Sequence, residues 1–285
     1  VTLGDDIDNI QLAALQGGIT INAREGEPYG TIQGSDFVYS PDGRKVVGND
    51  GFYQRTPTSD IVIGNINPDW NAGITNSFSY KGLNASFLID IQKGGDIFSL
   101  DQWYGQGTGL YPNTVGNNDL GNPKRDPVLD ANGDKLWPFI DIPGYDPENG
   151  YSPESGGIIN EGVVGIDNDG DDEFYEYKEN KKRIDGGIYT AYGFVNDPNG
   201  RFVYDASYVK LREISIGYTI PQSLLNNTFI GKLTVSLIGS NLWIIHKNLP
   251  HADPEASQGF GNVQGWQSGV YPTSRNIGFK VDLTF

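Results

Sequence analysis

The chain has 285 residues, with 20 Lys and Arg against 36 Asp and Glu, so its formal net charge is −16 at neutral pH. A negative charge of this size repels phosphate backbones and argues against nucleic acid as a partner. Only 37% of the residues are hydrophobic, and 39 Gly and 16 Pro favour a turn-rich protein built from strands. No apolar run approaches the roughly 20 residues of a transmembrane helix. The absence of Cys excludes disulfides and thiolate chemistry and leaves the compartment open.

The beginning of the chain indicates processing or a longer parent. It starts at Val1 and contains no Met, so we expect a processed product or a part of a longer polypeptide. No charged segment followed by an apolar one marks a signal peptide. Residues 1–69 mix Gly, Asp and short apolar alternations, and we predict a loop region with one local β-hairpin. Its strands are expected at Thr31 to Tyr39 and at Lys45 to Val47, around the turn Pro41-Asp42-Gly43.

A long hairpin is predicted next. From Trp70 to Tyr80 apolar and polar residues alternate with a period of two, and a second alternating stretch follows the turn Lys81-Gly82. Ten residues at about 3.3 Å span roughly 33 Å, which a tilt of about 40° reduces to about 25 Å. That is the height of the apolar band of an outer-membrane barrel. Strands of soluble proteins are usually nearer five or six residues, so the length favours lipid contact.

Residues 99–204 lose this periodicity and are rich in Gly, Asn, Asp and Pro. We predict a long loop, and a loop of this length is expected to be functional or disordered. Its scattered aromatic residues argue against complete disorder.

Three further strands are predicted in the remainder of the chain. In Ala206 to Ile220 the apolar parity switches near Arg212-Glu213, which a β-bulge or the edge of a lipid band explains. A fourth strand begins at Leu233 and ends near Trp243. The last strand, Ser274 to Phe285, alternates without exception, and by itself it fits an edge strand of a soluble sheet equally well.

The connections between these strands decide the fold class. Short turns alternate with long loops, which is typical of a bacterial outer-membrane barrel with turns in the periplasm and loops outside. We therefore predict an all-β fold, an antiparallel transmembrane β-barrel with long extracellular loops. The barrel is incomplete in this chain, because about five strands cannot close and open edges in lipid leave backbone groups unsatisfied. The aromatic residues expected at the membrane interface are Trp70 and Trp243 on the outer rim, and Tyr80, Tyr218 and Phe285 on the inner rim.

Several short motifs resemble the carboxyl-terminal part of SusC/RagA-type TonB-dependent outer-membrane transporters. The resemblance covers about residues 60–98 and 204–285, extends to 24–30, and does not include 99–204. The residues that carry it are Arg24-Glu25-Gly26-Glu27-Pro28-Tyr29-Gly30, Asn67-Pro68-Asp69-Trp70, Ser207-Tyr208-Val209-Lys210-Leu211-Arg212-Glu213-Ile214, Gly217-Tyr218-Thr219-Ile220-Pro221, Gly239-Ser240-Asn241-Leu242, Asp253-Pro254-Glu255, Tyr271-Pro272, Ser274-Arg275 and Phe285.

This resemblance implies a non-enzymatic importer of the cell outer membrane. Such a transporter is a barrel of about 22 strands with a plug, and a SusD-like surface lipoprotein closes over its mouth. Glycans or peptides are captured between the two, and TonB drives import by pulling on an amino-terminal segment that is not present here. The implied organisation is an extracellular loop region (1–69), a transmembrane hairpin (70–98), a long extracellular loop (99–204), and carboxyl-terminal transmembrane strands with one further extracellular loop (205–285).

One acidic stretch is a candidate calcium site and the sole cofactor that the sequence suggests. Carboxylates surround Gly170 at alternate positions, but the distant Glu of an EF-hand is missing, and a solvated acidic loop tip remains the alternative. The expected ligands are Asp167, Asp169, Asp171 and Glu173. The similar stretch Asp130-Ala131-Asn132-Gly133-Asp134 is explained by a turn.

Aromatic residues of the loops are candidates for contact with the substrate or the partner. They would stack on sugars or contact peptide, and the alternative is that they pack the loops together or against the lipoprotein. These residues are Trp103, Tyr104, Trp137, Phe260 and Trp266.

No catalytic motif is recognisable. His246 and His251 lack zinc-type spacing, and there is no nucleophile elbow or phosphate-binding loop. The competing hypothesis is a secreted β-rich carbohydrate-binding module or a β-sandwich glycan hydrolase. The two hypotheses differ in one observable, because a sandwich buries the apolar side of each strand whereas a barrel leaves it exposed in an isolated chain.

Overall fold

The structure is a computed structural model, and it describes residues 1–136, 150–166, 176–187, 191–194, 196–255, 261, 264–271 and 273–285. The chain forms two compact units. Unit 1 comprises Val1–Asn65, Phe98–Val203 and Gly259–Ser268, and unit 2 comprises Ile66–Ile97, Tyr204–Gln258 and Gly269–Phe285. Within the described part of the chain, every helix is too short or too polar to cross a bilayer.

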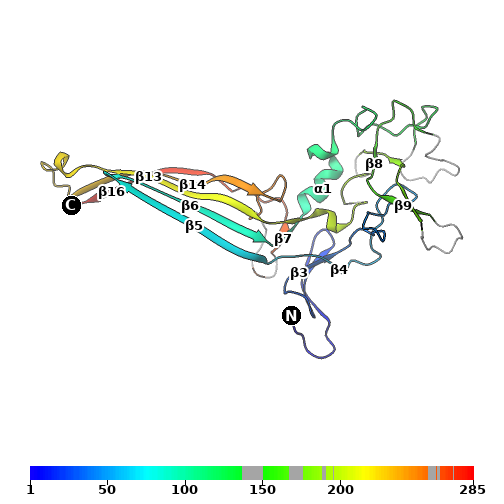
Figure 1. The fold of residues 1–285 in the computed structure, drawn as a ribbon, viewed down its shortest axis with the longest axis horizontal. Helices are drawn as coiled ribbons and strands as arrows, with labels where there is room; N and C mark the ends of the chain where they lie inside the picture. The colour runs from blue at the N-terminus through cyan, green and yellow to red at the C-terminus, as the bar shows by residue number, and fades with distance from the viewer. Residues whose placement is uncertain are drawn as a thin grey trace. The chain divides into compact units, whose positions relative to one another are not determined.

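Unit 2 is a five-stranded antiparallel sheet (Figure 1). Neighbouring strands along the chain are neighbours in the sheet, in the order β16-β14-β13-β6-β5. All five predicted strands are confirmed, and their bounds are β5 (Pro68–Tyr80), β6 (Leu83–Gly94), β13 (Tyr208–Thr219), β14 (Lys232–Lys247) and β16 (Asn276–Thr284). Within the described residues the sheet does not close, because β5 and β16 each have one neighbouring strand.

The connections of this sheet differ sharply in length. β5 and β6 are joined by Lys81 and Gly82, which have φ angles of 46° and 88° as a two-residue hairpin turn requires. A Cβ on Gly82 would lie 2.9 Å from the Thr219 carbonyl oxygen, so this turn packs closely against the end of β13. The turn between β13 and β14 contains the short 3-10 helix η4 (Gln222–Leu224). The connections from β6 to β13 and from β14 to β16 leave from the opposite ends of the strands.

A β-bulge lies in the middle of β13, and it is one of the two explanations offered for the switch of apolar parity. The register shifts between Leu211 and Glu213 against both neighbouring strands, so Arg212 is the extra residue. Leu211 is paired with Ile89 and Ile214 with Phe87. The bulge therefore keeps the apolar side chains on both sides of it on one face of the sheet.

Unit 1 contains a second antiparallel sheet, in the order β1-β2-β3-β4. Its strands are β1 (Asn9–Leu15), β2 (Ile19–Arg24), β3 (Thr31–Gly34) and β4 (Ile61–Asn65). The predicted hairpin around Pro41-Asp42-Gly43 is confirmed near its turn, where Tyr39 bridges Lys45 and the Val46 N–H donates to the Val38 carbonyl at 2.8 Å. Its first part, Thr31–Gly34, pairs with β2 and β4 instead. β3 is paired with β2 on one side and with β4 on the other, and its residue Ile32 is fully buried. Pairing on both sides and this burial make β3 more stable than a two-stranded ribbon would be.

The stretch predicted as an aperiodic loop folds into short elements, and one of them corrects the all-β expectation. The helix α1 (Leu100–Thr108) begins at Ser99, whose side chain accepts a hydrogen bond from the Gln102 N–H, and it ends at Gly109 with a φ of 80°. Two glycines inside the helix, Gly105 and Gly107, hid it from the sequence pattern. The other elements are β7 (Asp96–Ser99), η1 (Pro112–Thr114), β8 (Ile158–Ile159), β9 (Val163–Ile166), β10 (Glu176–Glu179), β11 (Arg183–Ile184), η3 (Asn199–Phe202), β12 (Val203–Asp205) and β15 (Trp266–Gln267).

Segments far apart in the sequence share the core of unit 1. The Asn199 side chain connects its own segment to the segments of Ser35 and Gly17. Its Oδ1 accepts hydrogen bonds from the Ser35 N–H at 3.0 Å and the Ser35 hydroxyl at 2.9 Å, and its Nδ2 donates to the Gly17 carbonyl at 2.6 Å. The fully buried side chains come from the same segments, and include Ile21, Ile32, Val47, Phe98, Val163 and Phe202. The two regions predicted as separate loops therefore form one folded unit.

Candidate functional site: the two faces of the unit 2 sheet

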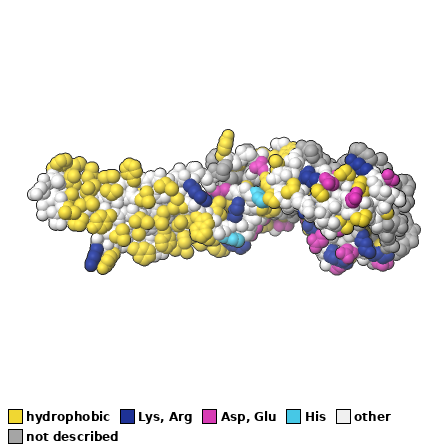
Figure 2. Space-filling view, turned by 90° about the horizontal axis from the view of Figure 1, so that it is seen from above, with side chains coloured by type: hydrophobic (Ala, Val, Ile, Leu, Met, Phe, Trp, Pro, Cys, Tyr) yellow, Lys and Arg dark blue, Asp and Glu magenta, His cyan; other side chains and the backbone are white. Residues whose placement is uncertain are grey.

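One face of the unit 2 sheet is apolar and exposed. Phe78, Leu237 and Phe279 are 60%, 57% and 80% exposed, although all three are large hydrophobic side chains. Figure 2 shows hydrophobic side chains gathered over these strands. A β-sandwich would bury this face against a second sheet. Among the described residues no such layer covers it, and this observation contradicts the sandwich hypothesis.

The apolar side chains form continuous rows across the strands. One row follows the register through Phe78, Ala85, Ile216, Leu237 and Phe279. Each residue of the row lies directly opposite its neighbour on the next strand, so the side chains share one face. The face is therefore apolar across all five strands and not at isolated positions.

The five aromatic residues predicted for the membrane interface are all exposed. Tyr80 and Tyr218 both pair with Leu83, so they lie together at the end of the sheet that carries the short turns. Trp70 and Trp243 lie towards the other end, where they pair with Lys93 and Leu211. The Phe285 ring stacks on Phe229 of the β13–β14 turn at 5.6 Å between ring centroids. Two groups of aromatic residues thus lie towards opposite ends of the strands.

The opposite face of the sheet is polar and lined by small side chains. Ser77, Ser86 and Ser215 follow one another across three strands. Asn84 on the same face donates a hydrogen bond to the Thr219 hydroxyl, whose oxygen lies 3.0 Å from the hydroxyl oxygen of Thr234. Such a surface is suited to contact with water.

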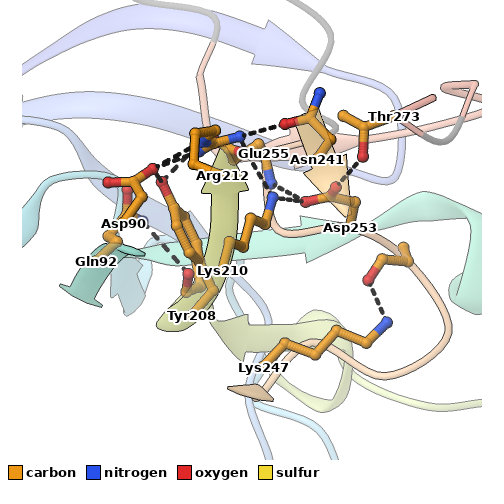
Figure 3. A network of polar contacts seen from close by, with 12 residues as sticks. Asp90, Gln92, Tyr208, Lys210, Arg212, Asn241, Lys247, Asp253, Glu255 and Thr273 are labelled. Atoms are coloured by element: carbon orange, nitrogen blue, oxygen red, sulfur yellow. Dashed lines mark hydrogen bonds and ion pairs between the residues drawn. The ribbon is translucent and has the colours of Figure 1, made fainter. Parts of the chain in front are cut away.

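A network of charged side chains lies on this polar face (Figure 3). The Arg212 guanidinium donates to Glu255 through Nη1 to Oε2 at 2.8 Å and through Nη2 to Oε1 at 2.6 Å. It also contacts the Asp90 carboxylate on β6 and donates to Asn241 Oδ1 at 3.1 Å. The Tyr208 hydroxyl lies 3.2 Å from Asp90 and 3.1 Å from Glu255. The bulge residue of β13 is therefore the centre of the network.

A second, more deeply buried pair adjoins this centre. The side chains of Lys210 and Asp253 are 5% and 3% exposed and form an ion pair, and Lys210 also contacts Glu255. Asp253 accepts a further hydrogen bond from the Thr273 hydroxyl at 2.6 Å. Burial opposes ionisation of Asp253, but the hydrogen bonds from Lys210 and Thr273 outweigh it and hold the pKa of Asp253 below its ordinary value.

The network holds the segment after β14, residues 248–255, against the polar face of the sheet. We call this segment the strap. Burial again opposes ionisation, but the hydrogen bonds from Arg212 and Lys210 lower the pKa of Glu255. Leu249 of the strap is fully buried with Ile97 and Ala206. Because every charge of the network has an opposite partner, the arrangement fixes a segment and presents no nucleophile or free base for catalysis.

The predicted metal ligands Asp167, Asp169, Asp171 and Glu173 lie outside the described residues. Among the residues that the structure does describe, no group of three His, Asp or Glu side chains could hold a metal ion. The turn proposed for Asp130 to Asp134 is confirmed, because Asp130 Oδ1 accepts hydrogen bonds from the N–H groups of Asn132 and Asp134 at 2.9 Å each.

Three of the predicted loop aromatics are described, and all three lie in unit 1. Trp103 and Tyr104 of α1 pack with Phe194 at 5.2 and 5.0 Å between ring centroids. The Trp266 indole N–H donates to the Gln16 carbonyl at 3.0 Å. These contacts fit the alternative that the aromatics pack loops together, and contact with a substrate or partner stays a prediction. Trp137 and Phe260 lie outside the described residues.

The network was not predicted from the sequence. The motifs that contain Lys210, Arg212, Asp253 and Glu255 carry the family resemblance, but no pairing between them was predicted. The useful signal is the matching spacing: two cations at alternate positions of one strand and two carboxylates at alternate positions of a later segment. The partner Asp90, 122 residues from Arg212, carries no such signal.

Comparison with known proteins identifies relatives. No family model matches the chain. The TonB-dependent receptor P26 of Formosa agariphila is 23% identical over 236 residues, which are 79% of this chain and 18% of the receptor. The TonB-dependent receptor P3 of the same organism is 35% identical over 91 residues, 30% of this chain and 9% of the receptor.

Solved structures with a similar fold include two states of the RagAB peptide importer. The open-open state matches with a TM-score of 0.54 and 15% identity over 100% of this chain and 25% of that chain. The closed-closed state matches with a TM-score of 0.56 and 16% identity over 99% and 25%. The chain spans a quarter or less of each of these proteins. The resemblance drawn from the motifs is confirmed: the chain is similar in sequence to TonB-dependent receptors and has a fold similar to part of the RagAB importer.

Proposed function

We propose that the chain is part of the wall and outer loops of a TonB-dependent importer in the cell outer membrane. The observation that carries this proposal is the exposed apolar face of unit 2 opposite a polar one. A single sheet with these two faces fits between hydrocarbon and an aqueous interior. Four of its strands have 12 to 16 residues, more than the 9 to 11 that a tilted strand needs to cross a bilayer.

The lengths of the connections support an orientation. We propose that the short turns at Lys81-Gly82 and at 220–231 lie in the periplasm. The long connections 99–204 and 248–275, together with residues 1–69, would then lie outside the cell. In this orientation Trp70 and Trp243 occupy the outer interface and Tyr80, Tyr218 and Phe285 the inner one.

The cargo and partners are proposed by analogy with the relatives. RagAB is named a peptide importer, and the motif resemblance implies glycans or peptides as cargo and a SusD-like lipoprotein as partner. TonB would act through a plug that lies outside these 285 residues. The chain itself would supply wall and loops and no catalytic group, and its charge of −16 argues against nucleic acid.

A matched pair of substitutions tests the proposal in the full-length protein. Phe279 is 80% exposed on the apolar face, and the adjacent Gly278 lies on the polar face with space around it for a side chain. Phe279→Lys should destabilise the folded protein in the membrane by about 2–4 kcal/mol if it lies near the bilayer midplane, whereas Gly278→Lys should have little effect.

The measurement is the amount of folded protein in the outer-membrane fraction, followed by urea unfolding in lipid. Equal effects of the two substitutions would argue against lipid contact, because a lysine at an exposed position of a soluble sheet changes stability little. Recovery of the native protein from the medium without detergent would also contradict the proposal.

A further inference from the structure

A cavity of about 630 Å³ lies within unit 1. Its volume is in the range of small-molecule sites. Four segments form it: a turn near residue 44, the residue Tyr53, the residues from the end of β8 to the start of β9, and the end of β10. Its lining includes Arg44, Lys45, Tyr53, Asn160, Glu161 and Glu179.

The walls of the cavity are fixed by backbone hydrogen bonds. The Val163 N–H donates to the Lys45 carbonyl at 2.9 Å, and the Val47 N–H donates to the Val163 carbonyl at 2.8 Å. Gly162 has a φ of 155°, and a Cβ at this position would collide with the Lys45 carbonyl oxygen. The glycine therefore permits the close approach of two walls, so the cavity is formed before a ligand arrives.

Two buried amides form a rigid part of the lining. Asn160 and Asn180 are each 5% exposed. Asn160 Nδ2 donates to the Gly51 carbonyl at 3.0 Å, and Asn180 Nδ2 donates to the Asn160 carbonyl at 2.8 Å. A polar group that is buried and held in this way keeps its direction, which is what recognition of a polar ligand needs.

One residue of the lining, Lys45, carries a positive charge and contacts aromatic rings. The Lys45 ammonium lies 3.9 Å from the centroid of the Phe37 ring and 5.4 Å from that of Tyr53. Burial lowers the pKa of Lys45. In the part of the chain that the structure describes, no Asp or Glu lies within ion-pair distance of it, whereas Arg44 is already paired with Asp42. Lys45 is therefore available to an anionic group.

Two carboxylates complete the lining. Glu161 and Glu179 are exposed, and neither forms an ion pair among the described residues. The charge of Glu161 acts on both Lys45 and Tyr53, and that of Glu179 acts on Arg44. One cavity therefore presents a free cation and free anions together with directed amides.

We propose that this cavity binds a short peptide as a zwitterion, with the peptide carboxylate at Lys45 and its ammonium group at Glu161 and Glu179. The phenol of Tyr53 and the amide of Asn160 would contact the peptide bonds between the two ends. The inference rests on the proposed function for its biological meaning, since an importer needs a cargo site, and it selects peptide over glycan.

Titration calorimetry on the full-length protein in detergent tests this inference. The probes are trialanine, its amino-acetylated form, its carboxyl-amidated form and maltotriose. Trialanine should bind, each blocked form should bind about tenfold or more weakly because one charge-assisted contact is lost, and maltotriose should not bind. Absence of trialanine binding, or equal binding of maltotriose, would overturn the proposal.

Substitutions then assign the ends of the peptide. Lys45→Met keeps the aliphatic contact with the rings and should abolish the difference between free and amidated trialanine. Glu161→Gln with Glu179→Gln should abolish the difference between free and acetylated trialanine. Lys178→Met, on the neighbouring strand position that does not line the cavity, is the matched control and should bind like the unaltered protein.

An unchanged preference in Lys45→Met, or the same loss in the Lys178→Met control, would place the peptide elsewhere and overturn the assignment. The result is independent of the membrane test. If the cavity binds no peptide, Phe279→Lys and Gly278→Lys should still differ in their effect on stability. If those two substitutions have equal effects, the calorimetry still reports whether the cavity binds peptide.

Discussion

Arg212 and Glu255 face each other with two parallel hydrogen bonds, at 2.8 and 2.6 Å, across 43 residues of sequence. Arg212 is also the extra residue of the bulge in β13. A bulge bends its strand and can direct a side chain that a regular strand would place differently. The irregularity in the strand and the attachment of the strap are therefore one feature: the bulge restores the apolar face and places the guanidinium opposite the strap.

Replacing Arg212 with Lys should weaken the attachment of the strap. An ammonium group cannot make the two parallel bonds of a guanidinium, and both side chains are about a quarter to a third exposed, so we expect a loss of about 1–3 kcal/mol. Urea unfolding of the full-length protein in lipid measures it. The control is the double variant Arg212→Ala and Glu255→Ala. Its loss of stability should be smaller than the sum of the losses in the two single variants. Strict additivity would show that the pair does not couple.

The network should make stability depend on pH on the acid side. Burial opposes the ionisation of Asp253 and Glu255, but their hydrogen bonds prevail and their folded-state pKa values are lowered. Their contribution is therefore fully present above their unfolded pKa values, near about 4, and is lost as pH falls through the lowered folded values.

Unfolding midpoints measured between neutral pH and pH 3 check this dependence. They should be flat down to about pH 5 and then fall. The double variant Asp253→Asn and Glu255→Gln should start lower at neutral pH and fall less steeply. A variant with the same acid slope as the unaltered protein would exclude these two carboxylates as its source.

Two adjacent glycines should respond differently to alanine. Gly17 and Gly18 have φ angles of 106° and 77°, so alanine is strained at either position. Only at Gly17 would the added Cβ meet another residue, at 2.7 Å from the ring of the fully buried Phe98. We expect the free energy of unfolding to fall by about 1–2 kcal/mol in Gly18→Ala and by about 2–4 kcal/mol in Gly17→Ala. Hydrogen exchange of residues 19–34 measures the stability of unit 1, and equal protection in the two variants would contradict the close contact.

The strands of unit 2 could be predicted because their evidence is local. Alternation with a period of two is visible in any stretch such as Trp70 to Tyr80, and the parity switch near Arg212 indicated either a β-bulge or the edge of a lipid band. β2 shows the same alternation at Ile19, Ile21 and Ala23, but it spans six residues and was hidden among glycine-rich segments. Helix α1 was missed because two glycines interrupt its pattern.

The polar network and the cavity could not be predicted in the same way. Each depends on side chains that only the completed fold brings together, such as Asp90 with Arg212 or Lys45 with Glu161. Charge type at a position indicates that a partner is needed, but it does not say which of the many carboxylates in a chain of this composition provides it. Sequence patterns therefore located the faces of the sheet and left the contacts upon them open.

Quenching by brominated lipid tests the lipid contact most directly. These 285 residues contain no Cys, so a single Cys introduced among them and labelled with a fluorophore reports from one known position. Labels at Ile216 and Leu237, on the apolar face, should be quenched in the full-length protein, and labels at the adjacent Ser215 and Ser236, on the opposite face, should not. Equal quenching at all four positions, or none at Ile216 and Leu237, would contradict the account.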